Sequence, residues 1–368
     1  MSCFRLSALI VAGACTGMVR ASSPDFQVVN QAAWDAVCRV VIGNQGMGTG
    51  TVFDKIVNTR DALGNPTNYW LCILTAGHVT SGEAPMNIRA AFGNQSLTGP
   101  GPGLTTPAVY KADDPLIRNW NRDLSVFVVN VPADAFFNAL VPIRVLPAYD
   151  PLGNYDDIEI PVESPFSIVG YGNTGTFFNN GPAGFRNGYR RHDGTFGVKR
   201  FVNQTVTQHD VRGGPGNPEW NPEEEGYPGG YCGLALDWEL DSPMNAARVD
   251  GEGTAWGGDS GAPYLFDDER MPYSHNLYDW VTGNRLAARS RLLLGVHSGF
   301  SGTAAQGLPE EVKRWRYMDD GTGYGTSLSE GIVREWIHDQ CMNGVPEPGT
   351  MLALAAGLGA LIAQRRRR

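Results

Sequence analysis

Short apolar and β-branched runs, separated by polar segments that contain turn-forming residues, recur along most of the chain. The first two lie at 38–42 and 51–53, on either side of a glycine-rich corner at 43–50. The next run, at 69–74, follows a polar hairpin loop at 60–68. Short apolar runs bounded by turn residues are typical of buried β-strands. The pattern therefore predicts a protein built mainly of strands.

Strand-like runs continue through the second half of the chain. We predict strands, some with an attached turn, at 109–111, 124–129, 166–172, 264–266 and 291–298. Loops are predicted at 94–107 and 267–290, and 131–143 should cross between two halves of the fold. Helices are predicted at 311–315 and 330–340, and the second places on one face Ile332, Val333, Trp336 and Ile337.

Composition supports this assignment. A chain of 368 residues is long enough to bury the core of one large or two medium domains. Only 18% of the residues are charged, and the 47 glycines and 24 prolines suit many short strands better than long helices. The formal net charge is −9, so we expect no nucleic acid among the partners.

The candidate chemistry centres on Ser260, within the sequence Gly-Gly-Asp-Ser-Gly-Ala-Pro at 257–263. Glycines on both sides allow the backbone to turn sharply around the serine. A serine hydroxyl is a weak nucleophile until a base takes its proton, so catalysis requires a histidine and a carboxylate elsewhere. His78 stands just after one predicted strand and Asp123 just before another. These three residues are the candidate catalytic group.

Three motifs carry a resemblance to the chymotrypsin/trypsin-like serine proteases: Thr-Ala-Gly-His at 75–78, Asp-Leu-Ser-Val at 123–126 and Gly-Asp-Ser-Gly-Ala-Pro at 258–263. Their order differs from that in subtilisins and α/β-hydrolases. The resemblance covers about residues 28–342, and the cysteine that many animal members carry just after this histidine is missing. It implies an all-β fold of two six-stranded Greek-key β-barrels with a cleft between them and a C-terminal helix.

The resemblance also implies a role for each residue. Ser260 would attack a peptide carbonyl, His78 would take and return the proton, and Asp123 would hold the imidazole. The N–H groups of Gly258 and Ser260 would form the oxyanion hole. The expected function is that of an exported serine endopeptidase acting on proteins or peptides. A surface-binding homologue of the same fold that cleaves nothing, and a serine esterase, are the alternatives.

The same resemblance places the substrate pocket at Thr254, His297, Ser298, Gly299 and Phe300. Thr254 stands where trypsin-like specificity requires an aspartate, so cleavage after Lys or Arg is not expected. His297 matches a histidine of glutamate-specific bacterial members, although Ala255 replaces the hydroxyl residue that accompanies it there. The alternative is a pocket for an apolar residue, with His297 packed into its strand. The N-terminal region lacks an Arg-Ile-Val-Gly-Gly type of activation site, so a trypsin-style switch through Asp259 is not expected.

Residues 173–255 form a long insertion relative to compact members of this family. It contains an acidic run at 223–225 and a basic patch made of Arg186, Arg190, Arg191, Lys199 and Arg200. We interpret it as surface loops on the second barrel. Gating of the substrate is the alternative.

No residue pattern indicates a metal or a cofactor, and we expect neither. The remaining histidines have no paired metal-ligand spacing and are interpreted as surface residues: His192, His209, His275 and His338. The segment 319–323 lacks the acidic repeat of a calcium loop and is interpreted as a turn. Of the six cysteines, the four beyond the N-terminal segment allow three full pairings: Cys38, Cys72, Cys232 and Cys341.

The N-terminal segment 1–21 has the pattern of a secretory signal peptide: Arg5, an apolar run at 6–18 and a small-residue cleavage site. Cleavage before Cys15, as in a lipoprotein, is the alternative. Export would permit disulfides.

The C-terminal segment contains Pro-Glu-Pro at 346–348, an uncharged run at 351–363 and four arginines at 365–368. This arrangement resembles a PEP-CTERM sorting signal, which an exosortase reads in bacteria. The apolar run is short for a membrane span, which leaves a terminal core helix as the alternative, but the arginines favour a membrane-held tail. We therefore expect a signal peptide at 1–21, a trypsin-like domain at 22–344 and a sorting tail at 345–368. The exported protein would be held at the membrane by its tail and then reach the cell surface or the medium.

Overall fold

The computed structural model describes residues 26–27, 35–43, 46–93, 109–119, 123–145, 157, 160, 162–178, 188–192, 196–212, 233–239, 255, 257–266, 278–279, 284–285, 292–302, 315–317 and 321–344. The predicted signal peptide, the loop at 94–107 and the tail at 345–368 lie outside these residues. So do Thr254, His275, Cys232 and the acidic run at 223–225.

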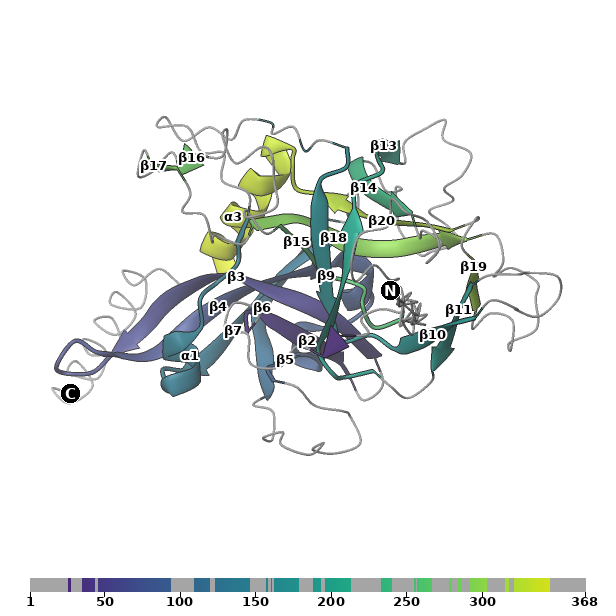
Figure 1. Ribbon diagram of the computed structural model, residues 1–368. Coiled ribbons are helices and arrows are strands. Elements are labelled where there is room, and N and C mark those ends of the chain that lie inside the picture. Colours follow the sequence, from purple (N-terminus) through teal and green to yellow (C-terminus); the bar gives the residue numbers. More distant parts are fainter. Residues whose placement is uncertain are drawn as a thin grey trace, which may run out of the picture.

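The first half of the chain forms a closed antiparallel barrel with strand order β2-β3-β4-β7-β6-β5 (Figure 1). The strands are β2 (Val37–Ile42), β3 (Gly46–Arg60), β4 (Pro66–Ala76), β5 (Ile88–Ala91), β6 (Val109–Asn119) and β7 (Leu124–Pro132). Strands β4 and β7 pair centrally, with Leu71 opposite Val129. Both strands are apolar along most of their length, and most of their side chains are buried because burial removes apolar surface from water. The predicted first barrel is confirmed.

Strands β3 and β4 form a hairpin that is longer than the sequence predicted. Strand β3 continues to Arg60 and β4 starts at Pro66, so the predicted loop at 60–68 narrows to five residues, 61–65. The Asp61 carboxylate holds this loop by accepting hydrogen bonds from the N–H groups of Leu63 and Asn65, both at 2.8 Å. Strand β6 also extends well beyond the predicted 109–111.

The chain beyond β7, together with the N-terminal strand β1, forms a nine-stranded sheet in the order β1-β12-β9-β15-β18-β20-β14-β13, with β8 beside β18. Its strands are β1 (Phe26–Gln27), β8 (Arg144–Val145), β9 (Pro165–Gly170), β12 (Arg200–Thr205), β13 (Gln208–Arg212), β14 (Gly233–Glu239), β15 (Pro263–Phe266), β18 (Leu292–Gly302) and β20 (Gly321–Ser327). The closed barrel, this nine-stranded sheet and a C-terminal helix confirm the predicted all-β fold class.

The interpretation of 173–255 as surface loops was wrong in part. Strands β12, β13 and β14 from this segment belong to the main sheet, and β12 pairs with β9 over six residue pairs. Lys199, assigned to a basic surface patch, is buried just before β12. Its Nζ lies 5.6 Å from the ring centroid of Tyr171, and loss of hydration lowers the pKa of Lys199 to about 8.

Smaller strands occur where the sequence predicted a loop and a helix. Strands β10 (Thr174–Phe178), β11 (Gly188–His192) and β19 (Trp315–Tyr317) form a three-stranded sheet. Trp315 is therefore in a strand, not at the end of the helix predicted for 311–315; residues 311–314 lie outside the described residues. Strands β16 (Tyr278–Asp279) and β17 (Asn284–Arg285) pair within the predicted loop 267–290.

Among the described residues, two short 3-10 helices lie between β4 and β5: η2 (Gly77–Thr80) and η3 (Pro85–Asn87). Helix α1 (Ala135–Ala139) lies in the predicted crossover. Lys55 on β3 donates from Nζ to carbonyl oxygens at the C-terminal end of α1, including those of Phe137 at 2.9 Å and Leu140 at 2.7 Å. This ammonium group therefore caps a helix end, where it also favours the helix dipole.

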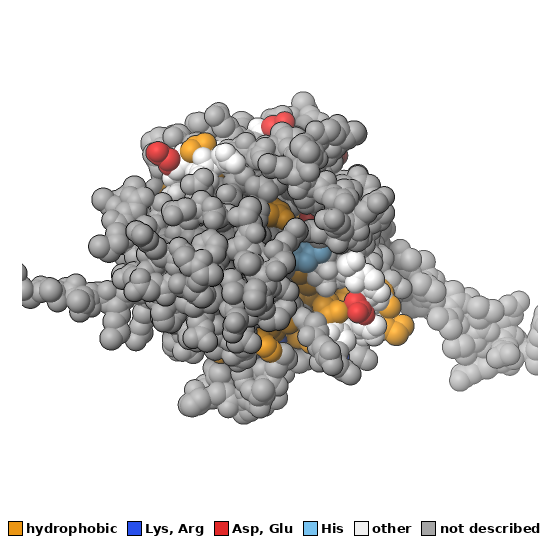
Figure 2. Space-filling model, turned by 90° about the vertical axis from the view of Figure 1, so that its right-hand side faces the viewer, with side chains coloured by type: hydrophobic (Ala, Val, Ile, Leu, Met, Phe, Trp, Pro, Cys, Tyr) orange, Lys and Arg blue, Asp and Glu red, His pale blue; other side chains and the backbone are white. Residues whose placement is uncertain are grey.

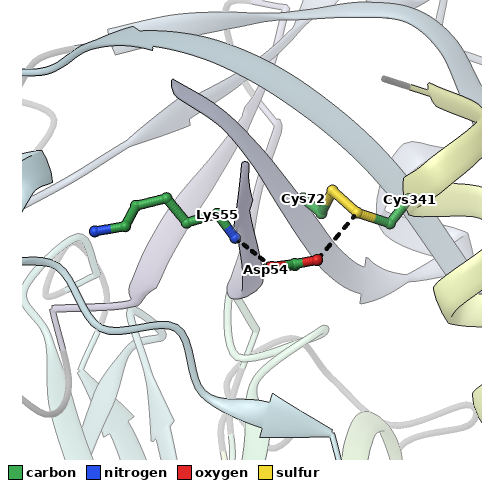
Figure 3. The surroundings of a disulfide bond; sticks show 4 residues. All are labelled: Asp54, Lys55, Cys72 and Cys341. Carbon is green, nitrogen blue, oxygen red and sulfur yellow. Dashed lines mark hydrogen bonds between the residues drawn. A yellow bond between two sulfur atoms is a disulfide. The ribbon is translucent and has the colours of Figure 1, made fainter. Parts of the chain in front are cut away.

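Helix α3 (Gly331–Gly344) closes the described fold, as predicted, and packs on the first barrel through buried Val333 and Ile337. Ile332 does not belong to this face, because 68% of it is exposed. A disulfide joins Cys341 on α3 to Cys72 on β4, and Cys341 Sγ lies 4.0 Å from Asp54 Oδ2 (Figure 3). This selects one pair among the pairings that the sequence left open. Cys38 is a buried free thiol. Within the described residues, no helix is long and apolar enough to cross a membrane.

Candidate active site

His78 lies at the point where β4 ends and the 3-10 helix η2 begins. Gly77 makes this turn possible: a Cβ there would lie 3.1 Å from the backbone nitrogen of Leu124 and 3.2 Å from the carbonyl carbon of Asp123. The Gly77 N–H donates to the Asp123 carbonyl at 2.8 Å. The backbone before β7 is therefore held against the turn that carries the histidine.

Asp123 is oriented toward His78 by two kinds of contact. The His78 N–H donates to Asp123 Oδ1 at 2.8 Å, and His78 Nδ1 lies 3.0 Å from Oδ2 and 3.1 Å from Oδ1. The Asp123 side chain is 6% exposed and that of His78 is 29% exposed. A buried carboxylate on Nδ1 favours the tautomer in which that nitrogen carries the proton and Nε2 can accept one. Figure 2 shows a histidine side chain at the surface, beside apolar side chains.

Asp123 adopts a positive φ of 48°, which is uncommon for a residue with a side chain. Aspartate tolerates this conformation better than most residues because its short polar side chain can bond locally. Here the carboxylate bonds the His78 N–H and the carbonyl bonds the Gly77 N–H. The unusual backbone conformation is thus stabilised by the same contacts that orient the histidine.

Ser260 lies in a tight turn between two glycines of positive φ, Gly258 at +101° and Gly261 at +84°. Side chains larger than hydrogen rarely adopt these angles. The turn leads into β15, and the Gly261 N–H donates to the His297 carbonyl on β18 at 2.8 Å. Ser260 is partly exposed, and its hydroxyl makes no hydrogen bond within the described residues.

Strand β3 brings the serine turn beside the histidine turn. A Cβ on Gly48 would lie 2.6 Å from Val79 Cγ1 and 3.0 Å from the Ser260 carbonyl oxygen. The residue after His78 and the backbone of Ser260 therefore pack on the same small patch of β3. Three motifs far apart in the sequence meet at one place.

The predicted oxyanion-hole donors are available in this turn. Within the described part of the chain, neither the N–H of Gly258 nor that of Ser260 donates a hydrogen bond. Two unpaired N–H donors in one partly exposed turn can receive a ligand oxygen.

The predicted pocket residues His297, Ser298, Gly299 and Phe300 all lie on β18. The His297 ring is buried, and its Nδ1 lies 3.1 Å from the hydroxyl of buried Tyr264 on β15. The Tyr264 ring fills the space beside Gly325, where a Cβ would lie 2.7 Å from it. Ala255, also buried, belongs to the same apolar cluster as Tyr264. The structure therefore joins His297 to a tyrosine that sequence reasoning did not connect with it.

No group of His, Cys, Asp or Glu suited to a metal ion occurs among the described residues. Of the remaining histidines, His192 lies on β11, His209 on β13, and His338 is exposed on α3.

Comparisons with known proteins bear on the C-terminus and on the fold. A family model described as the PEP-CTERM protein-sorting motif matches residues 344–368. The chain carries a PEP-CTERM sorting motif. This motif implies export, a membrane-anchored sorting signal and recognition by exosortase-type machinery. A search of curated protein sequences finds no significant match.

Among solved structures, the chain is similar to human heparin binding protein, at 13% identity and a TM-score of 0.45, covering 87% of this chain and 96% of that one. It is also similar to a scabies mite inactivated protease paralogue, S-D1, at 13% identity and a TM-score of 0.44, covering 87% of this chain and 97% of that one. Because both TM-scores lie below 0.5, the assignment of the fold rests on the strand order and register described above.

Proposed function

We propose that this protein is an exported serine endopeptidase that cleaves peptide bonds through an acyl-enzyme. The observation that carries the proposal is the contact of His78 Nδ1 with the buried Asp123 carboxylate, beside a serine turn with two unpaired N–H donors. A serine nucleophile, a base oriented by a carboxylate and donors for an oxyanion are the parts that acyl transfer requires.

In the proposed reaction, Ser260 Oγ forms a bond to the carbonyl carbon of the substrate while His78 Nε2 takes the hydroxyl proton. The N–H groups of Gly258 and Ser260 stabilise the resulting oxyanion. The carbon–nitrogen bond then breaks, and His78 returns the proton to the leaving amine. Water repeats the sequence on the acyl-enzyme, which releases the carboxylic acid and restores Ser260. The Ser260–His78 hydrogen bond is expected to form when substrate binds, since such bonds are often long in unliganded enzymes.

We further propose that the pocket beside β18 accepts an apolar residue. His297 is buried, and its Nδ1 lies 3.1 Å from the hydroxyl of Tyr264, which belongs to an apolar cluster. This contact favours a role for His297 in packing the pocket wall rather than in binding a substrate carboxylate. Thr254, predicted at the pocket base, lies outside the described residues.

A digest of a peptide library tests both the reaction and the specificity. Wild type should cut internal bonds after Phe or Leu more than about ten times faster than after Glu, and Ser260→Ala should cut none. His297→Leu should keep the apolar preference. Faster cleavage after Glu that disappears in His297→Leu would contradict the apolar pocket and restore the acidic one. Hydrolysis of simple esters without cleavage of any peptide would instead identify an esterase.

The sorting tail places this peptidase at a membrane before release. The proposed order of parts is a signal peptide at 1–21, a catalytic domain at 22–344 and a tail at 345–368. The full-length precursor should be found with membranes, and the mature form should lack the four C-terminal arginines. Mass spectrometry of protein from the native host reads the mature C-terminus directly. A mature chain that still ends at Arg368 would contradict processing of the tail.

A further inference from the structure

The backbone carbonyl groups of the serine turn are held one after another by hydrogen bonds. The Gly257 carbonyl accepts from the Asn173 N–H at 3.2 Å, and the Gly258 carbonyl accepts from the Thr49 hydroxyl at 2.9 Å. The Asp259 carbonyl accepts from the Ala262 N–H at 2.7 Å. The Ser260 carbonyl accepts from the Thr49 N–H at 2.8 Å. Four consecutive peptide groups therefore have a fixed orientation.

This matters because a peptide unit is planar and trans, so its C=O and its N–H point in opposite directions. The peptide that carries the Gly257 carbonyl also carries the N–H of Gly258. The peptide that carries the Asp259 carbonyl also carries the N–H of Ser260. Each carbonyl points toward the group that donates a hydrogen bond to it. The N–H on the same peptide, which is a proposed oxyanion donor, therefore points away from that group.

Thr49 holds the two neighbouring peptide groups, through the carbonyls of Gly258 and Ser260. It is fully buried, and its hydroxyl accepts from the Tyr171 N–H at 3.2 Å while it donates to the Gly258 carbonyl. Its own carbonyl accepts from the Thr75 hydroxyl at 2.7 Å, directly before the turn that carries His78. One threonine on β3 thus connects the serine turn, the segment after β9 and the histidine turn.

The segment after β9 is fitted closely to the same turn. The Gly172 N–H donates to Asp259 Oδ1 at 2.7 Å, and the Asp259 carboxylate is completely buried. A Cβ on Gly170 or on Gly172 would overlap that carboxylate. Three successive N–H groups, those of Tyr171, Gly172 and Asn173, therefore bond to Thr49, to Asp259 and to Gly257.

We infer that Thr49 is a positioning residue for the oxyanion hole: its hydroxyl and its N–H hold the turn at Gly258–Ser260 so that two N–H groups face the substrate oxygen. This inference rests on the proposed peptidase function. It assigns the geometry of the hole to contacts from β3 and from the segment 171–173 after β9. A glycine-flanked threonine in the corner 48–50 was the available sequence signal, but nothing in its neighbourhood pointed to a site 209 residues later.

The test compares Thr49→Val, which keeps the shape but removes the hydroxyl, with Thr49→Ser, which keeps the hydroxyl. For Thr49→Val we expect kcat to fall about ten- to a hundredfold with KM within about twofold of wild type, because the lost interaction acts in the transition state. The inhibition constant of a peptide aldehyde, whose adduct has an oxyanion, should rise by a similar factor. Thr49→Ser should recover most of the activity.

A matched control lies two residues away on the same strand. Thr51 is also buried, and its hydroxyl has no hydrogen-bond partner within the described residues. Thr51→Val should therefore match wild type in kcat and in inhibitor affinity. If Thr49→Val does not fold, as judged by thermal melting, Thr49→Ala takes its place with the same expectations.

Two failures are distinguishable. If wild type shows no Ser260-dependent peptide cleavage, the proposed function is wrong, and the positioning role of Thr49 is wrong as well. If wild type cleaves peptides and Thr49→Val does so with the same kcat, only the positioning role is wrong. A rise in KM with an unchanged kcat would also overturn it, because that result indicates a role in ground-state binding.

Discussion

Replacing Ser260 or His78 with alanine is expected to lower kcat for peptide cleavage roughly a million-fold, to a residual rate that the oxyanion hole and substrate binding sustain. The two residues act as one unit, since the hydroxyl is nucleophilic only while the imidazole accepts its proton. The Ser260→Ala, His78→Ala double variant should therefore be little worse than either single variant. Steady-state kinetics on one peptide substrate measure all three.

Suitable controls are available on the surface of the same molecule. His338→Ala removes an exposed histidine from α3, and Ser81→Ala removes an exposed serine next to η2. Both should retain wild-type kcat, and thermal melting should show every variant folded. Losses that multiply in the double variant, or a Ser260→Ala variant close to wild type, would contradict a shared catalytic role.

The second large effect concerns stability. Removing the disulfide by Cys341→Ala is expected to lower the free energy of unfolding by about 2–5 kcal/mol. The bond joins Cys72 to Cys341, 269 residues apart, so it restricts the unfolded chain strongly and fastens α3 to the first barrel. Denaturant unfolding of the purified catalytic domain measures the change.

Cys38→Ala is the matched control, because Cys38 is a buried cysteine without a disulfide. It should cost about 1 kcal/mol, the ordinary effect of trimming a core side chain. Adding a reductant should lower the stability of wild type and of Cys38→Ala by similar amounts and leave Cys341→Ala unchanged. Equal stability of Cys341→Ala and oxidised wild type would contradict a bond that stabilises the fold.

The first barrel could be predicted from the sequence because each of its main strands has a clear local pattern of apolar residues. Segment 69–74 and segment 124–129 are apolar runs next to turns, and they became β4 and β7. The contact between His78 and Asp123 was expected from the family resemblance, and the pairing of β4 with β7 brings the two residues together. Local pattern and tertiary pairing agree in this half of the molecule.

The second sheet was harder to predict because its strands lack that local signal. Strand β12 contains Arg200, Asn203 and Gln204, and its place in the sheet depends on pairing with β9. Burial of Lys199 is likewise a tertiary effect, set by the packing of Tyr171 and not by its own neighbours in sequence. The pairing of the cysteines could not be predicted for the same reason, because their spacing in sequence does not reveal which of them meet in the fold.

The most direct test of the central claim is the site of attachment of a fluorophosphonate probe, which reacts with a serine hydroxyl activated by a neighbouring base. Purified protein should be labelled at one position, and peptide mapping by mass spectrometry should find the label on Ser260. Labelling should be lost in Ser260→Ala and be slowed by several orders of magnitude in His78→Ala. An unlabelled wild-type protein, or a label on another serine that survives Ser260→Ala, would contradict the assignment of Ser260 as an activated nucleophile.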